Sequence, residues 1–123
     1  MQNTIKVLKV ETGRQPYEKT VGNDLKSLQT EVEGLIEVLC LPDGCLLVCN
    51  EEGKVNNMPP NRWAEGDIIC GPFFVCADSD EGEFVSMTDQ QIQDYKKQFS
   101  KIPTFAGDES QLEPTINVME FGL

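Results

Sequence analysis

Two apolar runs, residues 35–41 and 45–50, are separated only by Pro42-Asp43-Gly44. Proline supplies the fixed φ that the second position of a tight turn requires, and glycine accepts the positive φ that follows it. This pattern predicts a β-hairpin. Because both runs are apolar on both sides for much of their length, we expect the two strands to lie centrally in a sheet.

Apolar patterns predict three further strands. Residues 5–10 and 17–21 alternate apolar and polar side chains on either side of a turn and form a second hairpin. Residues 68–77 form another strand, and Pro72 is expected to mark a bulge or a sheet edge there. Residues 51–67 are polar with little periodicity, so they are interpreted as a loop.

Two helices are predicted from capping residues and apolar spacing. The first begins with Asn23 or Asp24 as its N-cap and ends at Gly34. The second begins at Thr88, where Thr88 and Gln91 match a capping box. The apolar face of the first helix is expected to consist of Leu25, Leu28, Val32 and Leu35.

This order of elements, strand–strand–helix–strand–strand–loop–strand–helix–tail, indicates an α+β fold. We expect a mainly antiparallel or mixed sheet of about five strands with two helices packed on it. The chain has 123 residues, which suits one domain. We expect this domain to span residues 1–101, and residues 102–123 to form an acidic, loosely attached C-terminal tail.

The charge balance restricts the partners that the chain can bind. With 21 acidic and 10 basic residues, the net charge is −11, which argues against direct binding to nucleic acids or anionic membranes. The acidic surface either keeps the protein soluble or imitates nucleic acid and occupies a basic groove on another protein. Neither a membrane-spanning stretch nor a signal peptide is recognisable, so a cytoplasmic protein is expected.

Several kinds of chemistry lack the residues that they need. The chain has no histidine, which excludes Ser-His-Asp and Cys-His systems and the usual zinc hydrolase sites. It also has no glycine-rich phosphate-binding motif. Cys45 and Cys49 have no second ligand pair, so the cysteines are interpreted as small core residues. We therefore predict no catalytic residue, no metal, no cofactor and no enzyme activity, although paired carboxylates could in principle support hydrolysis.

Residues 48–63 differ from their surroundings. They contain Lys54 and Arg62, which are the only basic residues between Lys26 and Lys96. Arginine and lysine beside asparagine side chains could hold a phosphate or carboxylate group, and the prolines favour one loop shape. The candidate ligand-binding residues are Asn50, Glu51, Lys54, Asn56, Asn57, Asn61, Arg62 and Trp63.

The same segment also has a purely structural interpretation. Asparagine side chains in turns often satisfy their own backbone. Lys54 and Arg62 would then pair with neighbouring glutamates. Trp63 would cover the core, whereas in the binding interpretation it would stack on a ring of the ligand. Both interpretations stay open at this point.

Four stretches of the chain resemble a known family: KVLKVETGRQPYEKTV, DLKSLQTEVEGLIEV, LVCNEEGKVNNMPPNR and SMTDQQIQDYKKQF. This is a small uncharacterised domain family of Gram-positive bacteria, their phages and conjugative elements. The resemblance spans residues 5–99, and its most specific part is the CNEEGK…PPNR motif. It implies an accessory protein of a phage or mobile element, and such proteins often counter host defence.

Three functional hypotheses follow. We favour a protein that sequesters a small anionic, nucleotide-like ligand through residues 50–63. Because such sites often form between symmetric copies, we then expect a homo-oligomer. The first alternative is an acidic interaction protein, or DNA mimic, that inhibits a host defence protein. The second alternative is a structural or regulatory domain without a ligand.

Overall fold

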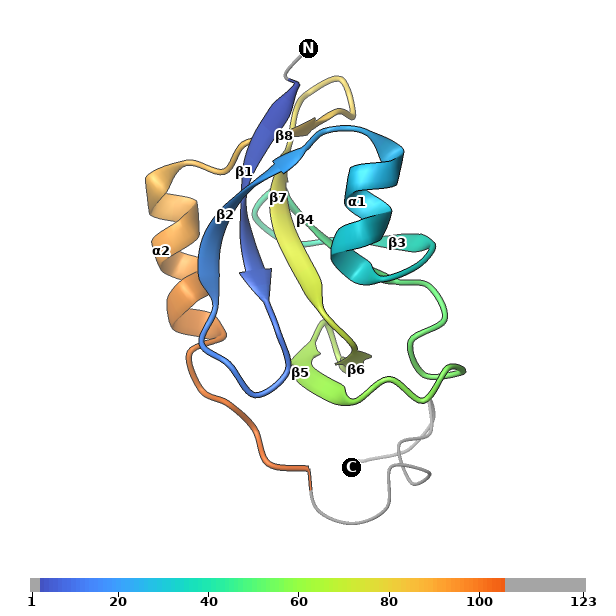
Figure 1. Cartoon of the computed structure of the whole chain (residues 1–123). Helices are drawn as coiled ribbons and strands as arrows, with labels where there is room; N and C mark the ends of the chain where they lie inside the picture. The colour runs from blue at the N-terminus through green and yellow to red at the C-terminus, as the bar shows by residue number, and fades with distance from the viewer. Residues whose placement is uncertain (1–2, 106–123) are drawn as a thin grey trace.

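The strands that are apolar on both faces form the centre of the main sheet. The computed structural model of the protein describes residues 3–105. Every residue of β4 (Cys45–Asn50) is buried, and β7 (Phe73–Asp78) is buried except for its last residue. The two strands pair antiparallel, so each covers the backbone hydrogen-bonding groups of the other (Figure 1).

Four further strands extend this centre. β1 (Thr4–Val10) pairs with β7, β2 (Tyr17–Gly22) pairs with β1, and β3 (Ile36–Cys40) pairs with β4. The strand order is β2-β1-β7-β4-β3, and the short β8 (Phe84–Val85) also pairs with β7. All of these pairings are antiparallel. The predicted α+β fold with a mainly antiparallel sheet and two helices is therefore confirmed, with six strands in the main sheet.

The two helices cover opposite faces of this sheet (Figure 1). Because side chains alternate along a strand, neighbouring residues of β7 belong to two different apolar clusters. Phe74 lies in the cluster that contains residues of α1 (Leu25–Val32). Val75 lies in the cluster that contains residues of α2 (Asp89–Gln98). The sheet is thus buried on both sides.

Both predicted helix starts are present. At the start of α1, Oδ1 of Asp24 accepts a hydrogen bond from the backbone N of Ser27 at 2.8 Å. Before α2, the hydroxyl of Thr88 accepts from the backbone N of Gln91 at 3.1 Å. The Gln91 side chain accepts in return from the backbone N of Thr88 at 2.9 Å, which completes the capping box.

The end of α1 differs from the prediction. The helix stops at Val32 because Glu33, rather than Gly34, takes a left-handed conformation with φ of 64°. Leu25 and Leu35, predicted on the buried face, are 60% and 54% exposed. A helix of 8 residues has little more than two turns, so fewer apolar residues reach the sheet than predicted.

The prediction that both strands of the 35–50 hairpin lie centrally is wrong for β3. This strand is the last in the order and pairs only with β4. Val38 is 40% exposed, and Cys40 is also exposed. An apolar run shows that a strand has a protected face, but it does not show whether the strand has one neighbour or two.

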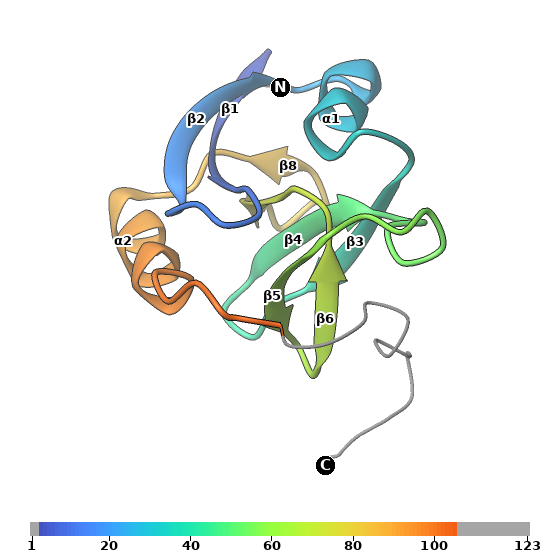
Figure 2. The same cartoon turned by 60° about the horizontal axis from the view of Figure 1, so that its bottom comes forward.

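Residues 51–67 are not a continuous loop. They contain β5 (Pro60–Ala64), which pairs with β6 (Asp67–Cys70) to form a separate two-stranded sheet. Its residues Ala64 and Ile69 belong to the cluster on the α2 side of the main sheet. Figure 2 shows this hairpin between α2 and β3.

The predicted strand 68–77 is divided into β6 and β7. The chain leaves β6 at Gly71, whose φ of +87° is not available to an ordinary strand residue. Pro72 follows and cannot donate a backbone hydrogen bond. Pro72 therefore marks a break between two strands of different sheets, and not a bulge or an edge within one strand.

The predicted tail, residues 102–123, lies outside the described residues from 106 onward. Within residues 3–105, neither helix combines the length and the apolar character that crossing a membrane requires.

Candidate functional site

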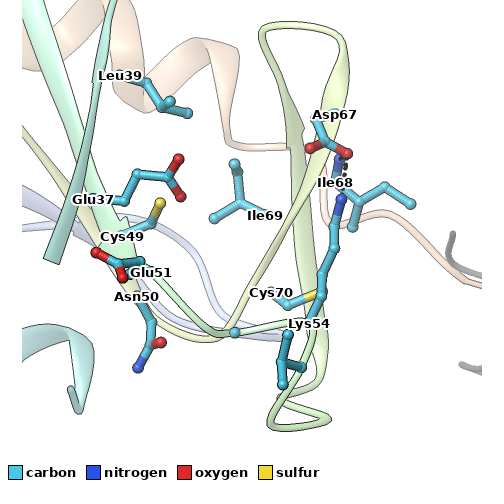
Figure 3. Close-up of a pocket in the computed structure, with 12 residues that line it drawn as sticks. Glu37, Leu39, Cys49, Asn50, Glu51, Lys54, Asp67, Ile68, Ile69 and Cys70 are labelled. Atoms are coloured by element: carbon cyan, nitrogen blue, oxygen red, sulfur yellow. Dashed lines mark hydrogen bonds and ion pairs between the residues drawn. The ribbon is translucent and has the colours of Figure 1, made fainter. Parts of the chain in front are cut away.

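A groove lies between the β3–β4 edge of the main sheet and the β5–β6 hairpin, with a cavity volume of about 270 Å³. Figure 3 shows Glu37 and Leu39 on one side of it and Ile69 and Asp67 on the other. We call it the acidic groove. Its apolar lining includes Leu39, Cys49, Ile69 and Cys70, and its charged lining consists of Glu37, Glu51, Lys54 and Asp67.

Strand alternation places the β3 and β4 residues in this groove. Glu37 pairs with Cys49 across the two strands, so both side chains leave the sheet on the same face as Leu39. Val38 leaves the sheet on the opposite face. The other wall is held in place by Ile69, which is buried in the same apolar cluster as Cys49. Apolar packing thus sets the width of the groove.

The turn after β4 closes one end of the groove. Gly53 approaches β6 so closely that a Cβ atom there would lie 2.5 Å from the carbonyl oxygen of Cys70. Asn50 fixes the turn from the other side. Its Oδ1 accepts from the backbone N of Glu52 at 2.7 Å, and its Nδ2 donates to the carbonyl oxygen of Val32 at 3.0 Å. Asn50 therefore connects the groove to the end of α1.

Three carboxylates and one ammonium group line the groove. Nζ of Lys54 forms an ion pair with Oδ1 of Asp67 at 2.5 Å. Across residues 3–105, the side chains of Glu37 and Glu51 have no ion pair and no hydrogen bond. Two carboxylates beside an apolar surface favour a cationic group as the bound species.

The Cys49 thiol in the groove is held in its protonated form at neutral pH. Burial raises the pKa of Cys49 to about 12, and the nearby carboxylates of Glu37 and Asp67 act in the same direction. Since the thiolate is the nucleophilic form, Cys49 is poorly suited to act as a nucleophile. The described part of the chain also contains no group of three histidine, cysteine or acidic side chains placed to hold a metal ion.

Asn61 and Arg62 do not line the groove but lie in the interior. Arg62 is 2% exposed. Its Nε donates to the carbonyl oxygen of Phe99 at 3.1 Å, its Nη1 to Oδ1 of Asn61 at 2.8 Å, and its Nη2 to the carbonyl oxygen of Arg14 at 2.6 Å. Burial lowers the pKa of Arg62. Nδ2 of Asn61 donates to the carbonyl oxygen of Val10 at 3.0 Å.

The other candidate residues lie elsewhere. Asn56 and Asn57 are exposed in the turn, where Asn57 takes a left-handed conformation with φ of 58°. Trp63 is 59% exposed on β5. The structure therefore separates Lys54 from Arg62, the two cations on which the predicted anion site depends. Among the eight candidates, it brings three together in the groove: Asn50, Glu51 and Lys54.

Most of the groove was not predicted. Glu37 is the only charged residue in the apolar run 35–41, and this exception could have identified it. The residues of β6 gave no such signal, because their position depends on a hairpin that the sequence did not reveal. The groove residues absent from the candidate set are Glu37, Leu39, Cys49, Gly53, Val55, Asp67, Ile68, Ile69 and Cys70.

Comparison with known proteins identifies a family. The family model described as "Domain of unknown function (DUF3846)" matches residues 5–100. No curated protein and no solved structure matches the chain. The match covers nearly the same stretch as the resemblance to a small uncharacterised domain family. The CNEEGK…PPNR motif and the bacterial and phage setting remain predictions.

Proposed function

The chain belongs to the DUF3846 family, a domain family of unknown function; within that family we propose that it is a protein-interaction domain that binds a basic partner. The acidic groove is the binding site. One observation carries this proposal. The carboxylates of Glu37 and Glu51 face an apolar lining without a cation partner among the described residues.

A lysine or arginine side chain matches both parts of this lining. Such side chains bury their aliphatic stems on apolar surface and keep the charged end near polar groups. The stem would lie on Leu39 and Ile69, and the charged end would reach Glu37 or Glu51. Arginine would form the stronger pair, because its guanidinium group can donate two hydrogen bonds to one carboxylate.

The charge of the molecule also favours a basic protein over a nucleotide. The net charge of −11 attracts basic proteins and repels anions.

The nucleotide-like ligand stays a prediction with weaker support. It needs Lys54 and Arg62 as anion-binding groups. The ammonium group of Lys54 is paired with Asp67, and the guanidinium group of Arg62 donates to oxygens of the protein itself. In the phage or mobile-element setting that the resemblance implies, the basic partner would be a host defence protein, which this domain would bind and inhibit.

Capture of a partner protein from a cell extract, by the wild type and by two charge-matched variants, tests the proposal. The immobilised protein is exposed to a cell extract, the retained protein is identified, and its purified form is titrated by calorimetry. The groove variant is Glu37→Gln/Glu51→Gln. The control, Asp80→Asn/Glu81→Gln, makes the same change in net charge in an exposed turn.

We expect a basic partner that binds the wild type and the control alike. The groove variant should bind it at least about tenfold more weakly, or about 1.4 kcal/mol. Equal binding to both variants would show that the groove is not the site. Retention of a nucleotide in place of a protein would favour the anionic-ligand hypothesis.

A further inference from the structure

Resting on the proposed function, we infer that the basic partner binds as an added β-strand along the free edge of β3. The segment it supplies is extended, with lysine or arginine at the positions that enter the acidic groove. This mode combines backbone hydrogen bonds, which give affinity, with alternate side chains, which give specificity.

The hydrogen bonds of β3 to β4 show which backbone groups face outward. Flanking the strand, the N–H of Glu51 donates to the carbonyl of Leu35 at 2.8 Å, and the N–H of Leu41 donates to the carbonyl of Cys45 at 2.9 Å. In an antiparallel pair, residues alternate between facing the partner strand and facing away from it. The residues whose N–H and C=O groups face the free edge are therefore Ile36, Val38 and Cys40.

Nothing in the described range of the chain covers this edge. Across residues 3–105, the outward backbone groups of β3 have no hydrogen-bond partner. The strand lacks most of the features that usually protect an edge, and Glu37 is its one charged side chain. Its register with β4 is regular over Ile36–Cys40, and it contains no proline and no lysine. The opposite edge strand, β2, carries two charged residues, Glu18 and Lys19, of the kind that usually protects an edge.

The side chains of β3 specify the sequence that would bind. A residue opposite Glu37 or Leu39 would project onto the groove face, where a basic side chain meets the unpaired carboxylate of Glu37. A residue opposite Val38 would project onto the other face, where Val38 is 40% exposed. The predicted partner segment therefore alternates basic and apolar residues.

Charge complementarity favours a basic partner segment over a second copy of the chain at the β3 edge. Each copy has a net charge of −11, so two copies repel each other, whereas a basic segment is attracted. A second copy on the β3 edge is nevertheless one of the outcomes that the experiment distinguishes.

Two synthetic peptides of eight residues test the inference, each with alternating lysine and valine and blocked ends. The second peptide is N-methylated at alternate residues. This removes the peptide N–H groups that would face β3 but keeps the charge and the side chains. Affinity is measured by fluorescence anisotropy. Hydrogen exchange at the amides of Ile36, Val38 and Cys40 is followed by NMR, with Glu37 and Leu39 as internal controls.

We expect the unmodified peptide to bind at least tenfold more tightly than the N-methylated peptide and to slow exchange at the three outward amides. Val38→Pro, which removes one outward N–H group, should weaken binding, whereas Val38→Thr should not. Equal binding of both peptides with unchanged exchange would overturn strand addition and leave the proposed function intact.

Two other results would overturn the inference in different ways. If neither peptide binds and the captured partner also ignores Glu37→Gln/Glu51→Gln, the proposed function fails together with strand addition. If the protein alone is a dimer in which the Val38 amide is already protected, a second copy occupies the edge.

Discussion

At the scale of the residue, Arg62 is a buried cation whose hydrogen-bond acceptors are all neutral. Two of them are backbone carbonyls in other parts of the chain, at Phe99 and Arg14. Phe99 lies at the C-terminal end of α2, where the helix dipole favours positive charge. Arg62 therefore joins three segments that are distant in the sequence, and its role in the described structure is to hold them together.

We predict that Arg62→Ala lowers the free energy of unfolding by about 3 kcal/mol, because several buried oxygens lose their donor. Arg14→Ala is the matched control. The Arg14 side chain is 75% exposed, and the interaction with Arg62 uses its backbone oxygen, so a change below about 0.5 kcal/mol is expected. Urea unfolding followed by circular dichroism measures both. Similar values for the two variants would argue against the role of Arg62.

Glu31 is the acceptor in a second buried group of charges. Its Oε1 lies 2.7 Å from Nζ of Lys9 and 3.1 Å from Nζ of Lys19, and the Lys9 side chain is 6% exposed. Burial acts to raise the pKa of Glu31, but the hydrogen bonds from the two lysines outweigh it. The pKa of Glu31 therefore lies below its ordinary value of 4.5.

This direction determines the pH dependence of stability. Because the pKa of Glu31 is lower in the folded protein, its contribution is fully present above pH 4.5 and is lost as the pH falls through the folded-state pKa. We predict that Glu31→Gln costs about 3 kcal/mol at neutral pH, because Lys9 keeps the neutral backbone oxygen of residue 31 but loses the carboxylate that balances its buried charge. The cost should shrink in acid.

Urea unfolding of the wild type and Glu31→Gln from neutral pH to below pH 4 measures this difference. Glu18→Gln, on the exposed part of β2, is the control and should change stability little at any pH. A cost of Glu31→Gln that is the same at all pH values would contradict a lowered pKa.

At the scale of the element, the β5–β6 hairpin decides where the groove lies. It is held to the main sheet by buried residues such as Ile69 and Ala64, and the turn after β4 brings the chain to it. The acidic groove therefore depends on close contact between this turn and β6, which only glycine permits at position 53.

We predict that Gly53→Ala opens the groove. Its Cβ would lie 2.5 Å from the backbone oxygen of Cys70, and a backbone atom cannot move aside as a flexible side chain can. Overpacking of this kind costs about 1–3 kcal/mol. Val55→Ala, in the same turn and 79% exposed, is the control and should be nearly neutral.

Thermal unfolding and amide chemical shifts of residues 67–70 check this prediction. Large shifts are expected in Gly53→Ala, and much smaller ones in Val55→Ala, because Val55 lines the groove but touches it without a backbone clash. An unchanged spectrum in the glycine variant would show that the turn adapts without moving β6.

At the scale of the whole molecule, the net charge of −11 acts on every encounter with a partner. Charge spread over the surface mainly changes the rate of association, whereas contacts within a groove mainly change the rate of dissociation. The two contributions can therefore be separated kinetically.

We predict that raising the salt concentration from about 50 to about 500 mM slows association of the lysine–valine peptide at least about tenfold. Stopped-flow anisotropy measures the rates. Glu37→Gln should speed dissociation, and Asp80→Asn/Glu81→Gln should leave dissociation unchanged. Association that does not depend on salt would contradict steering by the surface charge.

The local elements were predictable because each depends on residues that are close in the sequence. The N-cap Asp24 and the capping box of Thr88 and Gln91 need partners only three positions away, and the turn at Pro42-Asp43-Gly44 needs only its own backbone angles. The extended hydrophobic periodicity of the first helix was less reliable, since Leu25 and Leu35 are exposed.

Local residue patterns were therefore enough to predict the helix starts, the hairpins around residues 11–16 and 42–44, the α+β class and the strongly acidic charge. The edge position of β3, the burial of Arg62 and the shared groove of Glu37 and Asp67 became visible in the folded molecule alone. Strand order and hairpin packing arise from contacts between distant segments. No local pattern of side chains specifies which segments those are.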